Sequence, residues 1–144
     1  MKNEKVNIFY IDDDADDRML FEEALAEVDK SIALTALEDA DELLHILDNP
    51  PPVPHLIFVD LNMPRKNGYQ LLKEIKSNQS FRRFPVLILT TSAEEEAIEN
   101  ARLLGANAFI TKPSNFASLK AILNKCLTLD WNITSPQGFV IGAN

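Results

Sequence analysis

Short apolar runs of strand length alternate along the chain with segments in which apolar residues recur every three or four positions. The apolar runs predict five strands, at residues 6–11, 32–37, 56–59, 86–90 and 108–111. Most of these runs are apolar at consecutive positions, which is typical of strands that are covered on both faces. The pattern therefore predicts a sheet that lies between two layers of helices.

The segments between the strands carry apolar stripes at helical spacing and predict five helices. The stripes comprise Leu20, Phe21, Ala24, Leu25 and Val28; Ala40, Leu43, Leu44 and Leu47; Leu71, Leu72 and Ile75; Ala97, Ile98, Ala101 and Leu104; and Leu119, Ile122, Leu123, Cys126 and Leu127. Five successive strand and helix units indicate the α/β class, with a doubly wound parallel sheet. Ligands of such folds bind at the carboxyl ends of the strands.

Turn residues support these boundaries. The proline-rich stretch at 49–54 ends the second helix and leads to the third strand. Gly105 is expected to end the fourth helix in the left-handed conformation, and Ser114 or Asn115 is expected to cap the start of the fifth.

The chain divides into a domain at residues 5–128 and a C-terminal tail at 129–144, and we expect no separate output domain. The tail has no helical period and contains Pro136, Gly138 and Gly142. It also carries the large apolar residues Trp131, Ile133, Phe139, Val140 and Ile141, which are costly to leave in water. We expect an ordered tail that contributes to a homodimer. A frayed terminus and packing on its own domain are the alternatives.

Composition narrows the classes of function. The chain has 144 residues, 46% of them apolar, and 14 Lys and Arg against 22 Asp and Glu give a net charge of −8. This balance argues against direct binding of nucleic acid or anionic membranes, because both need clustered basic residues. A single cysteine indicates a reducing compartment, and there is no apolar run of membrane-spanning length. We therefore expect a cytoplasmic protein.

Polar residues suited to chemistry follow four of the predicted strands. Asp12, Asp13 and Asp14 follow the first strand, Asp60 follows the third, Thr90 ends the fourth with Ser92 two residues beyond it, and Lys112 follows the fifth. In a parallel sheet these ends share one edge, so several carboxylates would meet there and repel one another. A hard divalent cation with oxygen ligands relieves that repulsion, and Mg²⁺ fits best because it completes its coordination with water and phosphate.

The motifs around these residues resemble those of a known family. They are Ile11-Asp12-Asp13-Asp14 with Arg18, Asp60-Leu61-Asn62-Met63-Pro64 with Gly68, Leu89-Thr90, and Phe109 with Lys112-Pro113. Over residues 7–127 the chain resembles the receiver domains of two-component response regulators, the CheY-like proteins. That resemblance implies the flavodoxin/CheY-like (βα)5 fold with strand order 2-1-3-4-5.

The resemblance also implies a function. Asp60 would accept a phosphoryl group from a sensor histidine kinase or a histidine phosphotransfer protein, and phosphorylation would switch binding to an unknown downstream protein. The implied Mg²⁺ ligands are Asp13, Asp60 and the main-chain carbonyl of Asn62, with Asp12 acting through water. Thr90, Lys112 and Phe109 are the implied phosphoryl-binding and switch residues, and the implied tuning positions are Asn62 and Ser92.

Simpler interpretations exist for several of these residues. Asp14, Asp16 and Asp17 fit the start of a helix, where acidic side chains are favoured. An EF-hand loop that begins at Asp12 fails because Asp17 stands where glycine is needed. We expect structural or solvated roles for His45 and His55 and a buried apolar role for Cys126.

Two other functions compete with the signalling module. A phosphatase of the haloacid dehalogenase type also uses a strand-end Asp, a hydroxyl and a Lys around Mg²⁺. It needs Thr or Val where this chain has Asp16, and an acidic pair after the lysine, where the chain has Asp130 alone. A receiver that binds partners without phosphorylation is the other alternative, and the presence of every required residue argues against it.

Overall fold

The computed structural model describes residues 6–131 and 138–142 of the chain. Within these residues, five parallel strands form one sheet in the order β2-β1-β3-β4-β5, as predicted. The strands are β1 (Asn7–Ile11), β2 (Ala33–Leu37), β3 (Leu56–Val59), β4 (Val86–Thr90) and β5 (Ala108–Thr111). Val6 and Ile32 lie one residue before the strands that were expected to contain them.

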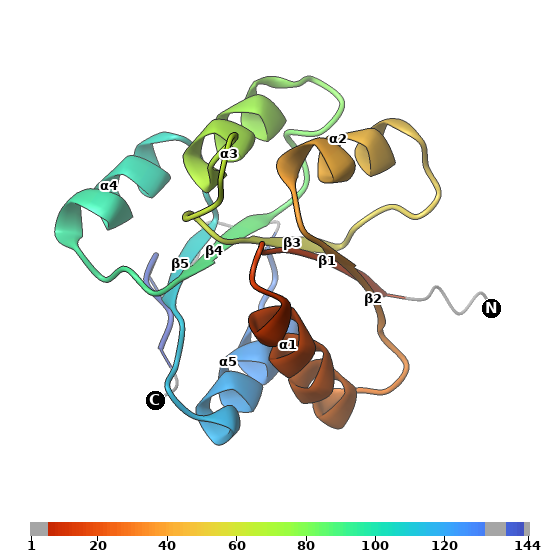
Figure 1. The fold of residues 1–144 in the computed structure, drawn as a ribbon, viewed down its shortest axis with the longest axis vertical. Helices are drawn as coiled ribbons and strands as arrows, with labels where there is room; N and C mark the ends of the chain where they lie inside the picture. The colour runs from red at the N-terminus through yellow and green to blue at the C-terminus, as the bar shows by residue number, and fades with distance from the viewer. Residues whose placement is uncertain (1–5, 132–137, 143–144) are drawn as a thin grey trace.

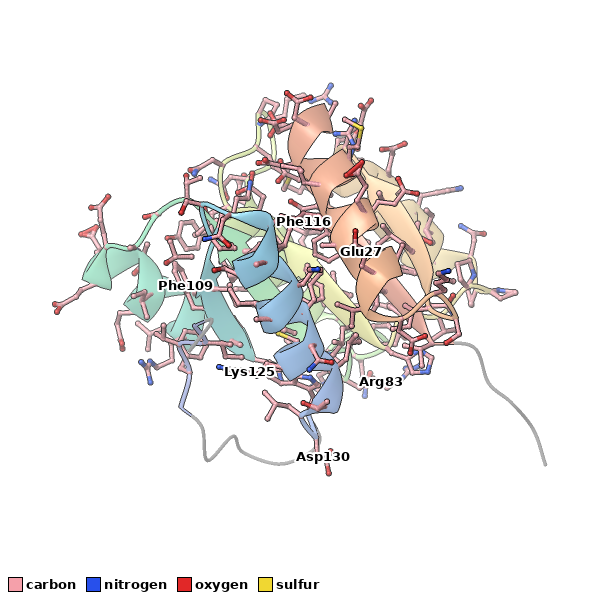
Figure 2. All side chains as sticks on the ribbon, turned by 90° about the horizontal axis from the view of Figure 1, so that it is seen from below. Glu27, Arg83, Phe109, Phe116, Lys125 and Asp130 are labelled. Atoms are coloured by element: carbon pink, nitrogen blue, oxygen red, sulfur yellow. The ribbon has the colours of Figure 1, made fainter. Side chains whose placement is uncertain are left out.

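A helix follows each strand, and the helices cover both faces of the sheet (Figure 1). They are α1 (Ala15–Val28), α2 (Ala40–Asp48), α3 (Gly68–Ser77), α4 (Glu95–Leu103) and α5 (Phe116–Thr128). Helices α2, α3 and α4 lie on one face, and α1 and α5 lie side by side on the other (Figures 1 and 2). None of the helices in the described part of the chain is long and apolar enough to span a membrane.

The sheet separates two apolar cores. Alternation along β1 sends Phe9 and Ile11 into the core beneath α2, α3 and α4, whereas Ile8 and Tyr10 enter the core beneath α1 and α5. All four side chains are at most 1% exposed. Coverage on both faces explains why the strand sequences are continuously apolar.

Capping residues define where three of the helices begin or end. Asp14 caps α1 by accepting hydrogen bonds from the main-chain N–H groups of Asp16 and Asp17. Asn115, one of the two expected caps, accepts from Ser118 at the start of α5. Gly105 follows α4 with a φ of 99°, in the left-handed region as predicted.

Part of the tail lies along the free edge of the sheet. The main-chain N–H of Phe109 in β5 donates to the carbonyl of Phe139, and Ile141 N–H donates to the carbonyl of Phe109. The Phe139 and Ile141 side chains join the two different cores, and Val140 points outward, 50% exposed. The described tail residues thus pack on their own domain, which was one of the alternatives. Ile133 and Pro136 lie outside the described residues.

Candidate functional site

The sheet brings the predicted polar residues to one edge. Asp12 follows β1, Asp60 follows β3, Thr90 ends β4 and Lys112 follows β5. Main-chain bonds extend the ladder to these positions, because Asp60 N–H donates to Ile11 and Lys112 N–H donates to Thr90. Asp12, Asp60 and Thr90 are the buried polar residues among those described. The geometry of the strands therefore keeps three polar side chains in buried positions, although such side chains prefer contact with water.

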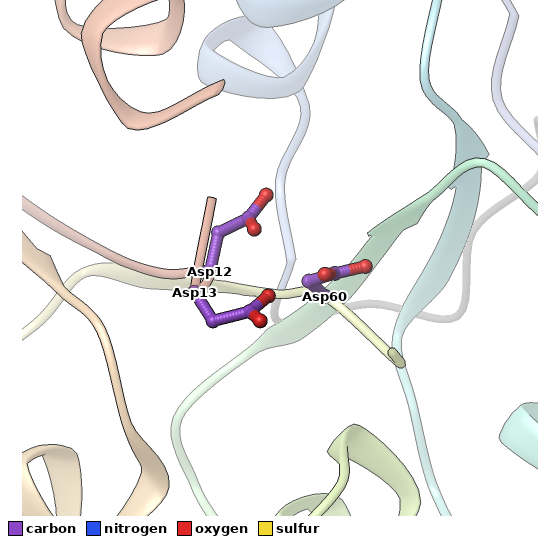
Figure 3. Close-up of side chains that lie close together, drawn as sticks. All are labelled: Asp12, Asp13 and Asp60. Atoms are coloured by element: carbon purple, nitrogen blue, oxygen red, sulfur yellow. The ribbon is translucent and has the colours of Figure 1, made fainter. Parts of the chain in front are cut away.

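Asp12 and Asp60 form an acidic triad together with Asp13. One carboxylate oxygen from each lies within 4.8 Å of the other two (Figure 3). Asp12 and Asp60 are buried and Asp13 is exposed, so the triad opens to solvent on the Asp13 side. Hard oxygen donors at this spacing, with one face open to water, fit a small divalent cation such as Mg²⁺.

Lys112 closes the other side of the triad. Its Nζ lies 2.7 Å from Asp12 Oδ2, 2.7 Å from Asp17 Oδ2 and 3.9 Å from Asp60 Oδ1. Although burial opposes the charged form, the hydrogen bonds that the ammonium donates to Asp12 and Asp17 raise the pKa of Lys112 above its ordinary value. The site therefore carries a permanent positive charge beside the Asp60 carboxylate.

Asp60 has an unusual acidity. Burial, followed by repulsion from Asp12, raises its pKa from 3.8 to about 6, although Lys112 and the Asn62 main-chain N–H act in the opposite direction. The charged form of Asp60 is thus only partly compensated. A cation or an electrophile bound at this carboxylate would remove that penalty.

The loop between β3 and α3 is packed tightly against Asp60. A Cβ added to Gly68 would overlap the main-chain carbonyl oxygen of Asp60, and Gly68 N–H donates to the carbonyl of Leu61. Asn67 caps α3 through a capping box with Gln70. The glycine in the recognised motif is therefore required by close approach of two backbone segments.

The proposed switch residues lie on the adjoining strands. Thr90 Oγ1 accepts a long hydrogen bond of 3.4 Å from Asn62 Nδ2, which joins the β3–α3 loop to β4. Phe109 is fully buried among side chains of the α2, α3 and α4 core. Ser92 is half-buried, and its carbonyl accepts a hydrogen bond from Thr111.

Two residues of the site were missed from the sequence. The Tyr10 hydroxyl donates to Asp12 Oδ2, the same oxygen that accepts from Lys112. Tyr10 and Asp12 are two residues apart on an extended segment and share a face, so alternation could have indicated this contact. Asp17 was assigned only to the helix start, whereas it also pairs with Lys112. Nothing in the sequence points to that pair.

The remaining candidates lie away from this edge of the sheet. His55 Nδ1 accepts from the main-chain N–H of Asn7 at the start of β1, which is a structural role as expected. Cys126 is the free cysteine of the described residues, and burial raises the pKa of its thiol to about 12. It is therefore an inert, buried side chain, as its place in the apolar stripe predicted.

Comparison with known proteins gives consistent matches. The family model for the response regulator receiver domain matches residues 8–124. A probable chemotaxis protein CheY of Rhizobium etli is 28% identical over 120 residues, 83% of this chain and 91% of that protein. The phosphorylated cyanobacterial phytochrome response regulator RcpA superimposes with a TM-score of 0.81 at 32% identity, covering 92% of this chain and 97% of RcpA. The Mn(2+)-bound form of response regulator Rcp1 gives 0.76 at 30% identity, covering 86% and 93%.

Proposed function

The chain belongs to the response regulator receiver domain family, and we propose that it is a single-domain regulator that accepts a phosphoryl group on Asp60 and thereby switches the binding of a partner. One observation carries this proposal. The buried Asp60 carboxylate lies beside the carboxylates of Asp12 and Asp13, and the Lys112 ammonium is 3.9 Å away from it. A nucleophile placed next to both a cation site and a positively charged side chain is what phosphoryl transfer requires.

Mg²⁺ is the cofactor of the proposed reaction. Asp13, Asp60 and the main-chain carbonyl of Asn62 would hold the ion, with Asp12 acting through a water molecule. When bound, Mg²⁺ neutralises charge that develops on the phosphoryl oxygens. The existence of an Mn(2+)-bound form of Rcp1 supports a divalent cation as the cofactor of this chain, because that protein shares the fold at 30% identity.

The protein side chains supply the rest of the chemistry. An Asp60 oxygen attacks phosphorus while the phosphorus–nitrogen bond of a phosphohistidine donor breaks, and the imidazole leaves with the electron pair of that bond. The Lys112 ammonium balances the negative charge on the phosphoryl oxygens, and the Thr90 hydroxyl donates to one of them. Slow hydrolysis of the resulting aspartyl phosphate would reset the protein without a separate enzyme.

The proposed donor is a sensor histidine kinase or a histidine phosphotransfer protein in the cytoplasm. The recipient of the signal is a downstream protein, and we propose neither nucleic acid nor a membrane as a direct partner. The net charge of −8 supports this view, because both of those surfaces are anionic.

Homodimerisation is a secondary proposal, supported by the exposed side chains Leu103 at the end of α4 and Val140 in the tail. Leu103 is 74% exposed and Val140 50% exposed. The guanidinium of Arg102, which precedes Leu103, lies over the ring of Phe139, which precedes Val140. A second copy could cover both apolar side chains together.

Phosphorylation with a small donor tests the main proposal. With acetyl phosphate and Mg²⁺, intact-mass spectrometry should detect one added phosphoryl group, and both a chelator and Asp60→Asn should abolish it. Labelling that survives Asp60→Asn would contradict the assignment of Asp60. Absence of labelling in the wild type would favour a receiver that acts without phosphorylation, whereas multiple turnover of a phosphate ester would favour the phosphatase.

A further inference from the structure

Lys112 is shared unequally among three carboxylates. It makes two short hydrogen bonds, to Asp12 and Asp17, and lies more than 1 Å further from Asp60, at 3.9 Å. The proposed reaction instead requires this ammonium next to the oxygens of a phosphoryl group carried by Asp60. The lysine is therefore drawn back from its working position in this structure.

Asp17 is held in place by the start of α1. Its main-chain N–H donates to the capping carboxylate of Asp14, and its side chain points across to β5 and Lys112. The main chain of Lys112 is itself fixed by its hydrogen bond to Thr90. Both ends of the Asp17–Lys112 pair thus belong to rigid elements, and the long lysine side chain is the part that can turn.

We propose that Asp17 is a positioning residue for Lys112: its carboxylate holds the ammonium in the withdrawn position and releases it toward Asp60 when an anion enters the site. This inference rests on the proposed function. Of the two carboxylates that bind the ammonium, Asp17 is the weaker partner, because its side chain is 33% exposed and that of Asp12 is completely buried. Solvent can replace the lysine at Asp17 but not at Asp12.

The withdrawn position of the lysine should affect the binding of cations and the binding of anions in opposite directions. While Asp17 holds the ammonium, the Asp60 oxygen stays accessible to a divalent cation. Without Asp17, the ammonium is left with Asp12 and Asp60, where it competes with the cation and is already placed to receive an anion. Loss of Asp17 should therefore weaken binding of Mg²⁺ and strengthen binding of a phosphoryl mimic.

The test compares Asp17→Asn with the wild type in two binding measurements. Calorimetric titration gives the affinity for Mg²⁺ alone, and ¹⁹F NMR gives the affinity for beryllofluoride at saturating Mg²⁺. We expect Asp17→Asn to weaken Mg²⁺ binding and to tighten beryllofluoride binding, each by about two- to fivefold, the range expected for a partly exposed ion pair. A residue that only stabilised the start of α1 would weaken both when replaced.

Asp16→Asn is the matched control. Asp16 is exposed in the same helical turn and carries the same charge, but its carboxylate is not a partner of Lys112. Asp16→Asn should change the affinity for Mg²⁺ and the affinity for beryllofluoride by less than about twofold. Asp17→Glu, which keeps a carboxylate at this position, should retain the wild-type affinities at least partly. In metal-free protein, the Lys112 ammonium NMR signal should shift in Asp17→Asn, as the ammonium moves toward Asp60, and should stay unchanged in Asp16→Asn.

The outcomes separate this inference from the proposal on which it rests. If the wild type does not bind beryllofluoride with Mg²⁺, the proposed function fails and the inference falls with it. If the wild type binds beryllofluoride but Asp17→Asn behaves like Asp16→Asn, or weakens the binding of both Mg²⁺ and beryllofluoride, only the proposed role of Asp17 is refuted and the proposed function stands.

Discussion

The carboxylate of Asp60 and the ammonium of Lys112 lie 3.9 Å apart, an ion pair without a direct hydrogen bond. This pair only partly offsets the burial of Asp60 and its repulsion by Asp12, which together raise its pKa to about 6. The folded protein therefore binds more protons than the unfolded chain between about pH 4 and pH 6. Its stability without metal should fall as the pH rises through this interval.

Asp60→Asn should stabilise the metal-free protein at neutral pH. A pKa raised from 3.8 to about 6 corresponds to about 3 kcal/mol, so the variant should gain up to that amount in its free energy of unfolding. The gain should disappear near pH 4, where the wild-type carboxyl is neutral as well. Urea unfolding at pH 4 and pH 7.5 measures both values, with Asp16→Asn as a surface control. An equal gain at the two pH values would contradict this explanation.

Asp13→Asn should weaken Mg²⁺ binding far more than Asp14→Asn. Asp13 offers an oxygen to the acidic triad, whereas the Asp14 carboxylate is occupied by the main-chain N–H groups of Asp16 and Asp17. Removing one of the few charged ligands of a divalent cation should cost at least about tenfold in affinity. Calorimetry is a better measurement than fluorescence, because the single tryptophan, Trp131, lies in the tail. Equal losses in the two variants would contradict the proposed ligand set.

Strand-end chemistry could be predicted because parallel topology fixes it. Once the apolar runs are assigned to adjacent parallel strands, the residues that follow them share an edge whatever their separation in sequence. Asp60 and Lys112 are 52 positions apart in the chain and still form an ion pair. Their meeting therefore followed from element order, without knowledge of any side-chain rotamer.

Contacts that depend on packing angles could not be predicted in the same way. The pair between Asp17 and Lys112 depends on how the first turn of α1 is rotated toward β5, which hydrophobic spacing does not specify. Phe139 and Ile141 are bound to β5 by main-chain hydrogen bonds, and such bonds leave no periodic signal in the sequence. Long-range contacts of irregular segments are thus the part that required the structure.

Thr90→Ala should separate phosphorylation from its structural consequence. The hydroxyl of Thr90 is buried and accepts a hydrogen bond from Asn62. The main-chain carbonyl of Thr90 accepts from the main-chain N–H of Lys112, and the substitution leaves this second bond intact. The variant should still accept a phosphoryl group, but the phosphorylation-dependent change in amide hydrogen exchange across residues 97–112 should shrink. Thr90→Ser, which keeps the hydroxyl, is the control. An undiminished change in Thr90→Ala would mean that the signal does not pass through this hydroxyl.

Gly68→Ala should damage the loop that carries Asp60. The new methyl group would overlap the Asp60 main-chain carbonyl, and backbone cannot move aside as a flexible side chain can. We expect a loss of about 1–3 kcal/mol in the free energy of unfolding, together with slower phosphorylation by acetyl phosphate. Gly142→Ala is the control, because a Cβ there meets open space. Unchanged stability of Gly68→Ala would show that the loop can relax.

The tail makes contacts that should be measurable as stability. Ile141 is 6% exposed, and two main-chain hydrogen bonds tie the tail to Phe109 at the edge of β5. Trp131 Nε1 also donates to the carbonyl of Cys126 near the end of α5. Burial of one large aliphatic side chain and two net hydrogen bonds together contribute a few kcal/mol before the entropy of ordering is subtracted.

Truncation after Leu129 should therefore lower the free energy of unfolding by about 2 kcal/mol and increase amide exchange at Phe109. Ile141→Ser should reproduce most of the loss, whereas Val140→Ser should not, because Val140 points into solvent. Light scattering on the same proteins tests the homodimer: a dimer that uses the tail should become monomeric on truncation and weaken in Val140→Ser. Unchanged stability would refute the packing of the tail on β5, and an unchanged molar mass would exclude the tail from assembly.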